Sequence, residues 1–417
     1  MNTLFHYIGG TKLIKKSLIT YFLYISVFVS SLIVILFSII KRNGSFMNIT
    51  PDGQLYYNLA QNLVAGQGLI NTIRVEEIIV PPLFAIILAP FALLFDSELP
   101  FFIFQYVLYG INAVGTAYIV YYLFKNRLAA WVTGLGYAVQ PVLYTNGPQF
   151  LLTETIFISF ILTTIWLLVR WIEERGSIRL GGLLIAVVSF SILFRPHLLF
   201  LLGIIFLLIL FFSWKFKQTL WTLLFLLIPV GLLALNGAYN QSVQGEFVTL
   251  ENYSGQNLYI ANNPETDVRF YATPLLEEFV EPYYFTLKND TLSVRSEKLK
   301  DRAITYIVDE PFETIERMIK KMILFFKPLG LIDGVTILVS VLGLVLAFIF
   351  DRKRWLMHTV IFLFILGFVG LTTLGLLVGG QRYRAPLIPV YLIYIGYFVS
   401  LTYSKMPGTK SIQEKLN

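Results

Sequence analysis

Long apolar runs separated by short polar segments dominate the chain. A membrane-spanning helix needs roughly 20 apolar residues, because the hydrocarbon core is about 30 Å thick and a helix rises about 1.5 Å per residue. Ten runs reach or approach this length: 17–40, 101–124, 128–144, 148–172, 180–194, 197–214, 218–236, 329–350, 355–378 and 386–404. This pattern predicts an all-α polytopic membrane protein with about ten transmembrane helices.

A further apolar run, at 80–95, is about 16 residues long and contains Pro81, Pro82 and Pro90. Runs of this size are typical of interfacial or re-entrant segments. If it does not span, both termini and fifteen Lys and Arg residues lie on the cytoplasmic side, against six in the short outer loops. If it spans, the later basic clusters move outside, which the positive-inside rule disfavours. We therefore predict cytoplasmic termini and a juxtamembrane helix on the outer face.

This topology divides the chain into three regions. Residues 1–236 form an N-terminal transmembrane module that includes a first outer loop at 41–100. Residues 237–328 form a large outer loop with fourteen of the 25 acidic residues, and 329–417 hold the last transmembrane helices and a short cytoplasmic tail. The cytoplasmic connections are short and contain no G-x-x-x-x-G-K-[ST] loop, which argues against an ATP-driven pump.

Composition narrows the class of protein further. Hydrophobic residues make up 56% of the chain and charged residues 14%, and mean hydropathy is +0.71. A soluble domain carries about 25% charged residues, so the sequence excludes an ordinary soluble enzyme. The net charge of +7 comes from small clusters between apolar runs, which set topology and predict no nucleic-acid partner. The absence of cysteine excludes disulfides and a thiol nucleophile.

A short amphipathic helix is predicted to begin after Thr50. Pro51 suits the first helical turn, and either Thr50 or Asp52 can cap it. An apolar stripe at i, i+4 and i+8 runs along the helix and two glycines end it: Leu55, Leu59, Leu63, Gly66 and Gly68. With about 14 residues it cannot span, so we expect it to lie in the interface with Tyr56 and Tyr57.

Two acidic residues at the outer surface are candidates for chemistry. Asp52 is either a helix cap worth about 1 kcal/mol or a carboxylate at the water–lipid boundary that acts as a general base on a hydroxyl. Glu154 lies near the outer end of the fourth span, where a carboxylate is costly and indicates function. Its structural alternative is a dipole partner at a helix N-terminus.

Arginines at the same level are candidates for anion binding. Arg195, at the outer end of the fifth span, either grips a phosphate or snorkels to the interface. Its neighbour His197 is more often a structural residue. Arg382, Tyr383 and Arg384 form the only basic cluster in a short outer loop, which binds a lipid phosphate or pairs with the acidic large loop. A divalent cation, if one is used, would need carboxylate ligands.

Segment 52–69, followed by Pro81-Pro82-Leu83 and Ala89-Pro90-Phe91, resembles the first outer loop of lipid-linked-sugar glycosyltransferases. These are membrane enzymes of the GT-C fold, and they include protein O-mannosyltransferases and lipid A aminoarabinose transferases. The resemblance is clearest over about 50–200. It continues more weakly through 255–264, Tyr306-Ile307 with Pro311, and 382–386.

The resemblance implies an inverting transferase that moves a sugar from a polyprenyl-phosphate donor to a lipid, glycan or protein acceptor. Asp52 would be the base and Glu154 would lie near the active site, while the donor phosphate would meet Arg195, Arg382, Tyr383 and Arg384. The preferred setting is a bacterial plasma membrane with the active site on its outer face, and the alternative is the endoplasmic reticulum.

The chain departs from the family pattern in one position. Many members carry a second acid directly after the first, whereas here that position is Gly53. Glu76 or Glu77 is then the candidate second carboxylate; the alternative is that both are solvated surface charges.

Two other functions are compatible with a polytopic chain. An O-antigen polymerase or ligase also has a large outer loop and arginines near lipid phosphates, but does not require the helix that begins at Asp52. A secondary transporter would show internal repeats and midplane charges, whereas the charges here gather at the outer surface.

Overall fold

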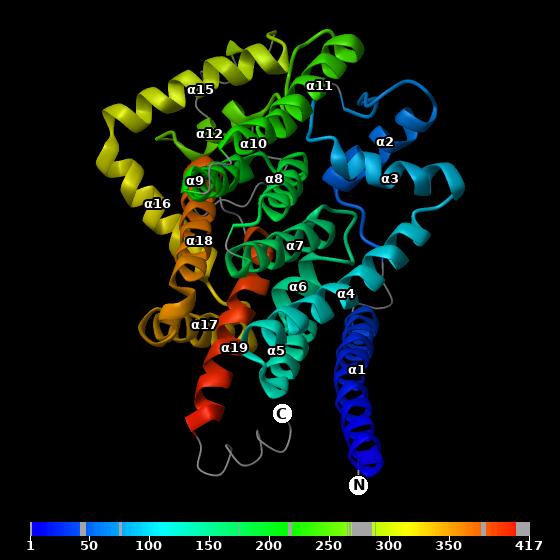
Figure 1. Cartoon of the computed structure of the whole chain (residues 1–417). Coiled ribbons are helices and arrows are strands. Elements are labelled where there is room, and N and C mark those ends of the chain that lie inside the picture. The colour runs from blue at the N-terminus through cyan, green and yellow to red at the C-terminus, as the bar shows by residue number, and fades with distance from the viewer. Residues whose placement is uncertain are drawn as a thin grey trace.

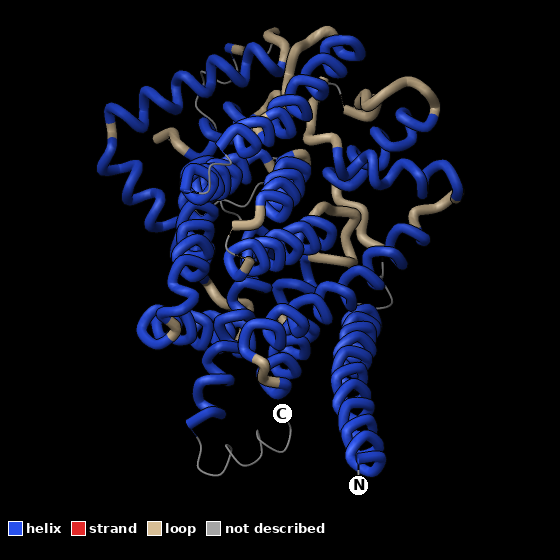
Figure 2. The backbone as a smooth tube through the Cα atoms, viewed as in Figure 1, coloured by secondary structure: helices blue, strands red, loops and turns tan. Residues whose placement is uncertain are grey.

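The computed structural model describes residues 2–41, 47–74, 77–174, 176–215, 219–264, 266, 268, 286–287, 289–376 and 381–405. Over these residues the protein is a bundle of helices with no strand (Figures 1 and 2). The only extended pairing in the same ranges is an isolated parallel bridge between Asn48 and Phe150. The predicted all-α class is therefore confirmed.

The helices follow the predicted apolar runs and add several in the outer segments. Before the large outer loop they are α1 (Asn2–Lys41), α2 (Pro51–Val64), α3 (Leu83–Leu94), α4 (Leu99–Phe124), α5 (Arg127–Val139), α6 (Pro141–Asn146), α7 (Glu154–Glu173), α8 (Ile178–Ile192), η1 (Pro196–Leu198), α9 (Leu199–Lys215), α10 (Thr219–Phe225) and α11 (Leu227–Gln244). From there on they are α12 (Ser254–Ala261), α15 (Leu292–Asp309), α16 (Pro311–Phe326), α17 (Leu331–Phe350), η2 (Arg352–Arg354), α18 (Trp355–Gly375), η3 (Gln381–Leu387) and α19 (Ile388–Lys405).

Seven helical segments of the described ranges are long and apolar enough to cross a membrane: Leu18–Lys41, Leu99–Phe124, Glu154–Glu173, Leu220–Gln244, Leu331–Phe350, Arg352–Gly375 and Arg382–Lys405. They account for seven of the ten predicted runs, and the protein is a multi-pass membrane protein. The other three runs form the shorter helices α5, α8 and α9. The run at 128–144 is divided because Gln140 has extended backbone between α5 and α6.

Both predicted helices of the first outer loop are confirmed. Helix α2 has 14 residues, Thr50 caps it by accepting a hydrogen bond from the backbone N–H of Gly53 at 3.1 Å, and Gly66 and Gly68 adopt positive φ after its end. Helix α3 has 12 residues, too few to span. The two helices pack together, and the buried Leu55 and Leu59 of α2 form a small core with residues of the α3 segment.

The described part of the 237–328 segment contains α12, α15 and α16, and it contacts the first outer loop. Helix α11 continues to Gln244, so the first eight residues of the predicted loop, 237–244, are helical. Asn252 then pairs with the chain before α3: its backbone N–H donates to the Ile79 carbonyl at 3.3 Å, and its side-chain oxygen accepts from the Ile79 N–H at 2.9 Å. The two segments are therefore in contact, and their helices α2, α3, α12 and α15 lie in the upper part of Figure 1.

Candidate functional site

The site forms where α2 and α7 begin side by side. The Asn48 N–H donates to the Gln149 carbonyl at 2.9 Å, and the Leu151 N–H donates to the Asn48 carbonyl at 3.1 Å. These two hydrogen bonds join the segments that lead into α2 and α7, although the segments are about 100 residues apart in sequence. Asp52 in the first turn of α2 and Glu154 in the first turn of α7 are thereby brought to one place.

Gly53 allows the two segments to approach this closely. A Cβ atom at position 53 would lie 2.7 Å from the Leu151 carbonyl oxygen, a backbone atom that cannot move aside as a side chain can. A second acidic residue directly after Asp52 therefore does not fit in this fold. Glycine at position 53 is therefore a steric requirement of this contact.

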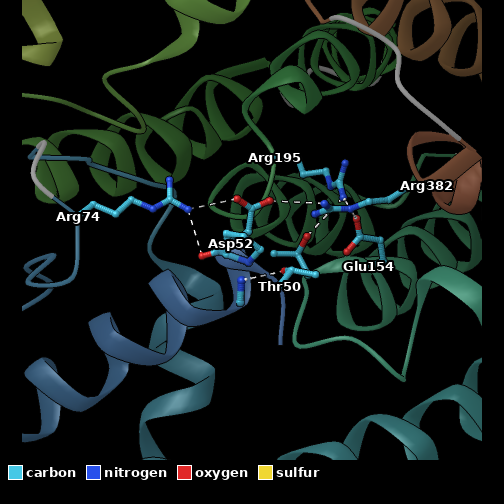
Figure 3. A network of polar contacts seen from close by, with 9 residues as sticks. Thr50, Asp52, Arg74, Glu154, Arg195 and Arg382 are labelled. Atoms are coloured by element: carbon cyan, nitrogen blue, oxygen red, sulfur yellow. Dashed lines mark hydrogen bonds and ion pairs between the residues drawn. The ribbon is translucent and has the colours of Figure 1, made fainter. Parts of the chain in front are cut away.

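Asp52 lies between two arginines, as Figure 3 shows. Its Oδ1 is 3.5 Å from Arg74 Nη2, and its Oδ2 is 3.5 Å from Arg382 Nη1. Because Thr50 caps α2, the Asp52 carboxylate is not used as the cap. Its side chain is 53% exposed, so the carboxylate is open to a ligand from outside.

Glu154 forms hydrogen bonds with Arg195 and Arg382. Its Oε1 accepts hydrogen bonds from Arg195 Nη2 and from Arg382 Nε, both at 2.6 Å. The Glu154 side chain is fully buried, so these charge-assisted bonds are protected from water. Arg195 also packs over the Phe157 ring at 5.4 Å. Arg382 thus bridges Glu154 and Asp52, and the three side chains form one network (Figure 3).

The charges of this network suit an anionic ligand. Three guanidinium groups, those of Arg74, Arg195 and Arg382, face two carboxylates, so the cluster has a net charge of +1. The N-termini of α2 and α7 add partial positive charge. Glu154 Oε2 and Arg195 Nε are buried with no hydrogen-bond partner among the described residues. A buried polar atom without a partner calls for an explanation, such as a bound water or ion.

One of the two predicted interfacial tyrosines, Tyr56, lies beside the site. Tyr56 lies one turn after Asp52 and packs edge-on against Phe84, with ring centroids 4.9 Å apart. Burial, followed by the nearby charge of Asp52, raises the pKa of Tyr56 above its usual value, so its hydroxyl stays protonated. Tyr57 is half-buried and faces Glu98 and Asp96 instead, outside the network. Of the two predicted interfacial tyrosines, only Tyr56 adjoins the cluster.

Arg384 is placed apart from the cluster. Its guanidinium is fully buried and donates to the carboxylate of Asp333 and to the carbonyls of Phe325 at 2.8 Å and Lys327 at 3.3 Å. The sequence predicted that Arg384 binds the donor phosphate. In the structure its guanidinium is instead hydrogen-bonded to groups of the protein. The sequence offered the acidic large loop, 237–328, as the alternative partner of this basic cluster. Arg382 instead pairs with Asp52 and Glu154, and Arg384 pairs with Asp333; none of these three acids belongs to that loop.

The remaining predicted residues have varied placements. Tyr383 is half-buried against the main core, and Glu77 is exposed, its backbone carbonyl accepting from Asn252 Nδ2 at 2.8 Å. Glu76 lies outside the described residues, as does the side chain of His197. No cluster of three His, Cys, Asp or Glu side chains suited to a metal occurs in the described part of the chain.

Two residues of the site were missed in the sequence. Arg74 was visible only as one of six basic residues in outer loops. Glu251 follows no motif, yet it accepts a hydrogen bond from Tyr253 and lies close enough to Tyr56 to affect its ionisation. Burial raises the pKa of Glu251 to about 7. In the structure Glu251 directly precedes Asn252, which is hydrogen-bonded to Ile79 and Glu77. The sequence offers no other signal for Glu251.

Comparison with known proteins does not assign the chain: no protein-family model matches it, and a search of curated proteins finds no match.

Proposed function

We propose that the protein is an integral-membrane glycosyltransferase. It moves a sugar from a polyprenyl-phosphate donor to an acceptor hydroxyl at the outer face of a bacterial plasma membrane. The observation that carries this proposal is the network in which the exposed carboxylate of Asp52 lies between Arg74 and Arg382. The GT-C-like order of sequence motifs supports it independently.

The proposed reaction is a direct displacement at the anomeric carbon. Asp52 takes the proton of the acceptor hydroxyl, whose oxygen forms the new bond to the sugar. The bond between the anomeric carbon and the phosphate oxygen breaks, and the electron pair leaves with the polyprenyl phosphate. Configuration at the anomeric carbon is inverted. Because the polyprenyl phosphate leaves as a stable anion, it does not need a general acid to protonate it. It needs cations beside the phosphate to stabilise the negative charge that develops there.

The arginines have distinct parts in this scheme. Arg382 and Arg74 flank Asp52 and would contact the donor phosphate, with Arg195 behind them. Glu154 would be a positioning residue, because its Oε1 fixes Arg195 and Arg382 at 2.6 Å and its own side chain is buried. Arg384 is left out of the phosphate site because its guanidinium is bound to Asp333.

The proposal includes the membrane topology. We propose ten crossings, made by the seven long helical segments together with α5–α6, α8 and α9. An even number of crossings puts both termini on one side, which agrees with the positions of the first residues of α1 and the last of α19 at the lower side of Figure 1. The positive-inside rule makes that side cytoplasmic.

A transfer assay on the purified protein tests the proposed chemistry. A panel of radiolabelled polyprenyl-phosphate sugars is supplied with membrane lipids, glycans and peptides as acceptors. We expect wild-type protein to release the label from the carrier and Asp52→Asn to lower the rate by about 10²–10⁴-fold, the usual contribution of a general base. Asp96→Asn is the matched control, because it removes an exposed acid from the same outer face.

Each contrary outcome has a specific meaning. Full activity in a folded Asp52→Asn variant would show that Asp52 is not the base. Turnover of a diphosphate-linked oligosaccharide, with none of any monophosphate-linked sugar, would replace the proposal by a polymerase or ligase.

A further inference from the structure

Helix α16 has three faces of different character. At about 100° per residue, Phe312, Ile315, Ile319 and Ile323 fall on one side of the helix, and these side chains are 52–86% exposed. Thr314, Lys321 and Phe325 fall on the opposite side and are buried against the protein. The charged residues Glu313, Glu316 and Lys320 lie on a flank between the two.

The buried face holds α16 firmly to the rest of the protein. Lys321 Nζ donates to the Ala261 carbonyl at the end of α12 at 3.0 Å, and Arg384 Nη1 donates to the Phe325 carbonyl at 2.8 Å. The direction in which the apolar face points is therefore fixed by contacts in the C-terminal half of the helix. Rotation of α16 to hide Phe312 and Ile319 would break these contacts.

The exposed apolar face continues into a membrane-spanning helix. Four residues connect α16 to α17. The side of α17 that faces away from the bundle exposes Leu331, Val335 and Leu338. Helix α17 is one of the segments long and apolar enough to cross the membrane. Along the left side of Figure 1, α16 descends from α15 toward α17 and packs beside α18. The lipid-facing surface of the bundle and the apolar face of α16 are thus adjacent along the chain.

Charge on the flank fits the boundary of a bilayer. Lys320 and Glu316 form an exposed ion pair at 2.6 Å on the side that lies between the apolar and buried faces. An amphipathic helix with a strongly charged side and large aliphatic or aromatic residues on the other lies in the interface plane. A water-exposed location would leave four large apolar side chains in contact with solvent, which soluble surfaces avoid as a contiguous patch.

We propose that α16 is an interfacial helix, with Phe312, Ile315, Ile319 and Ile323 inserted among the acyl chains of the leaflet that α17 enters and with Lys320 and Glu316 at the headgroups. The occupant of this face is lipid. The proposal is independent of the sugar-transfer chemistry. It makes part of the 237–328 segment a membrane-attached element and not a free outer loop.

The absence of cysteine from the chain makes a direct test possible. Ile319→Cys and Lys320→Cys are each labelled with bimane in the full-length protein, reconstituted in nanodiscs of phosphatidylcholine and phosphatidylglycerol. Adjacent residues on different faces form a matched pair. We expect nitroxide carried on the lipid acyl chain to quench the label at 319 at least threefold more than the label at 320, and aqueous iodide to show the reverse order. Leu338→Cys on α17 is the lipid-facing reference.

Two results would overturn the proposal. Strong iodide quenching at both positions would place the apolar face in water. Protection of position 319 from both quenchers, with lipid quenching retained at Leu338→Cys, would show that protein covers the face, for example a second copy of this chain. Neither outcome depends on whether a sugar donor is ever turned over, so this test and the test of Asp52 fail independently.

Discussion

At the scale of single residues, two acids near the site differ because of what surrounds them. Asp52 is flanked by Arg74 and Arg382, and it is half-exposed. Glu251 forms no ion pair with any described residue, and burial raises its pKa to about 7. The charged and titratable groups around it are Tyr253 on its own segment and Tyr56 on α2, with Asp52 beyond them. None of these is a cation that would stabilise an ionised Glu251.

This raised pKa gives a pH-dependent stability. Between the ordinary value of 4.5 and about 7, folded protein holds a proton on Glu251 that unfolded protein has lost. Stability therefore falls as pH rises through this window, by up to about 3 kcal/mol, since one pKa unit corresponds to about 1.4 kcal/mol. We expect Glu251→Gln to have the wild-type melting temperature at pH 4.5 and a higher one at pH 8, measured by thermal unfolding in detergent.

The exposed Glu77 provides the control for this measurement. Glu77→Gln removes an exposed acid from the segment that is hydrogen-bonded to Asn252. The melting temperature of this variant should equal that of wild type at both pH 4.5 and pH 8. A Glu251→Gln effect that is equal at pH 4.5 and pH 8 would show that Glu251 does not titrate in this range.

Sequence patterns identified Asp52, Glu154, Arg195 and Arg382 as candidates but did not reveal their contacts. Arg382 and Arg384 look alike in the sequence, yet one lies in the open network and the other in a buried ion pair. The difference arises from the 3₁₀ turn of η3, which directs side chains two positions apart to different neighbours. Glu251 lacks any motif, because only Tyr253 of its surroundings is local in sequence, whereas its burial depends on the tertiary fold and Tyr56 comes from the distant α2.

At the scale of elements, local signals predicted α2 well because they act within the helix itself. The cap at Thr50, the leucine stripe and the terminal glycines are all short-range features. The approach of α2 to α7 depends instead on the pairing of Asn48 with the chain around Phe150 and on the missing side chain of Gly53. No periodicity encodes a contact of this kind, so the site could be proposed but not assembled from the sequence.

The buried pair of Arg384 and Asp333 joins three elements: η3, the end of α16 and the start of α17. Asp333 also accepts hydrogen bonds from Gln140 Nε2 at 3.3 Å and from the Leu329 N–H at 2.8 Å. We expect Arg384→Ala to destabilise the protein by about 3–5 kcal/mol, because it leaves a buried carboxylate unpaired. Arg382→Ala should retain its fold and lose sugar transfer. Thermal unfolding and the transfer assay separate the two effects.

A double variant distinguishes this structural role from a direct role in binding phosphate. Arg384→Met with Asp333→Leu replaces the ion pair by apolar groups of similar size, which in other buried pairs is often neutral for stability. We expect it to recover most of the stability lost in Arg384→Ala and to retain transfer. A stable double variant that has lost transfer as completely as Arg382→Ala would return Arg384 to the phosphate site.

At the scale of the whole molecule, the site, the outer helical layer and the termini lie at defined levels of the bundle. Helices α2, α11 and α15 are at the top of Figure 1, whereas α1 begins and α19 ends at the bottom. Seven crossings alone would put the termini on opposite sides, so the shorter helices must also contribute if both ends are cytoplasmic. Helix α8, with 15 residues, covers about 22 Å at 1.5 Å per residue; it crosses only where flanking loops or a thinned bilayer complete the path.

The proposed topology predicts which face of the membrane exposes each loop. In intact cells, we expect a membrane-impermeant maleimide to label Thr72→Cys, which is exposed beside Arg74. Lys353→Cys, in the basic turn between α17 and α18, should react only after permeabilisation. Each variant carries the only thiol of the chain. Labelling of Lys353→Cys alone from outside would invert the topology, and labelling of both positions from outside would require an even number of crossings between α2 and η2. With the topology inverted, Asp52 and Arg74 would lie on the cytoplasmic face, against the positive-inside rule, and the donor phosphate could not approach them from the outer face as proposed.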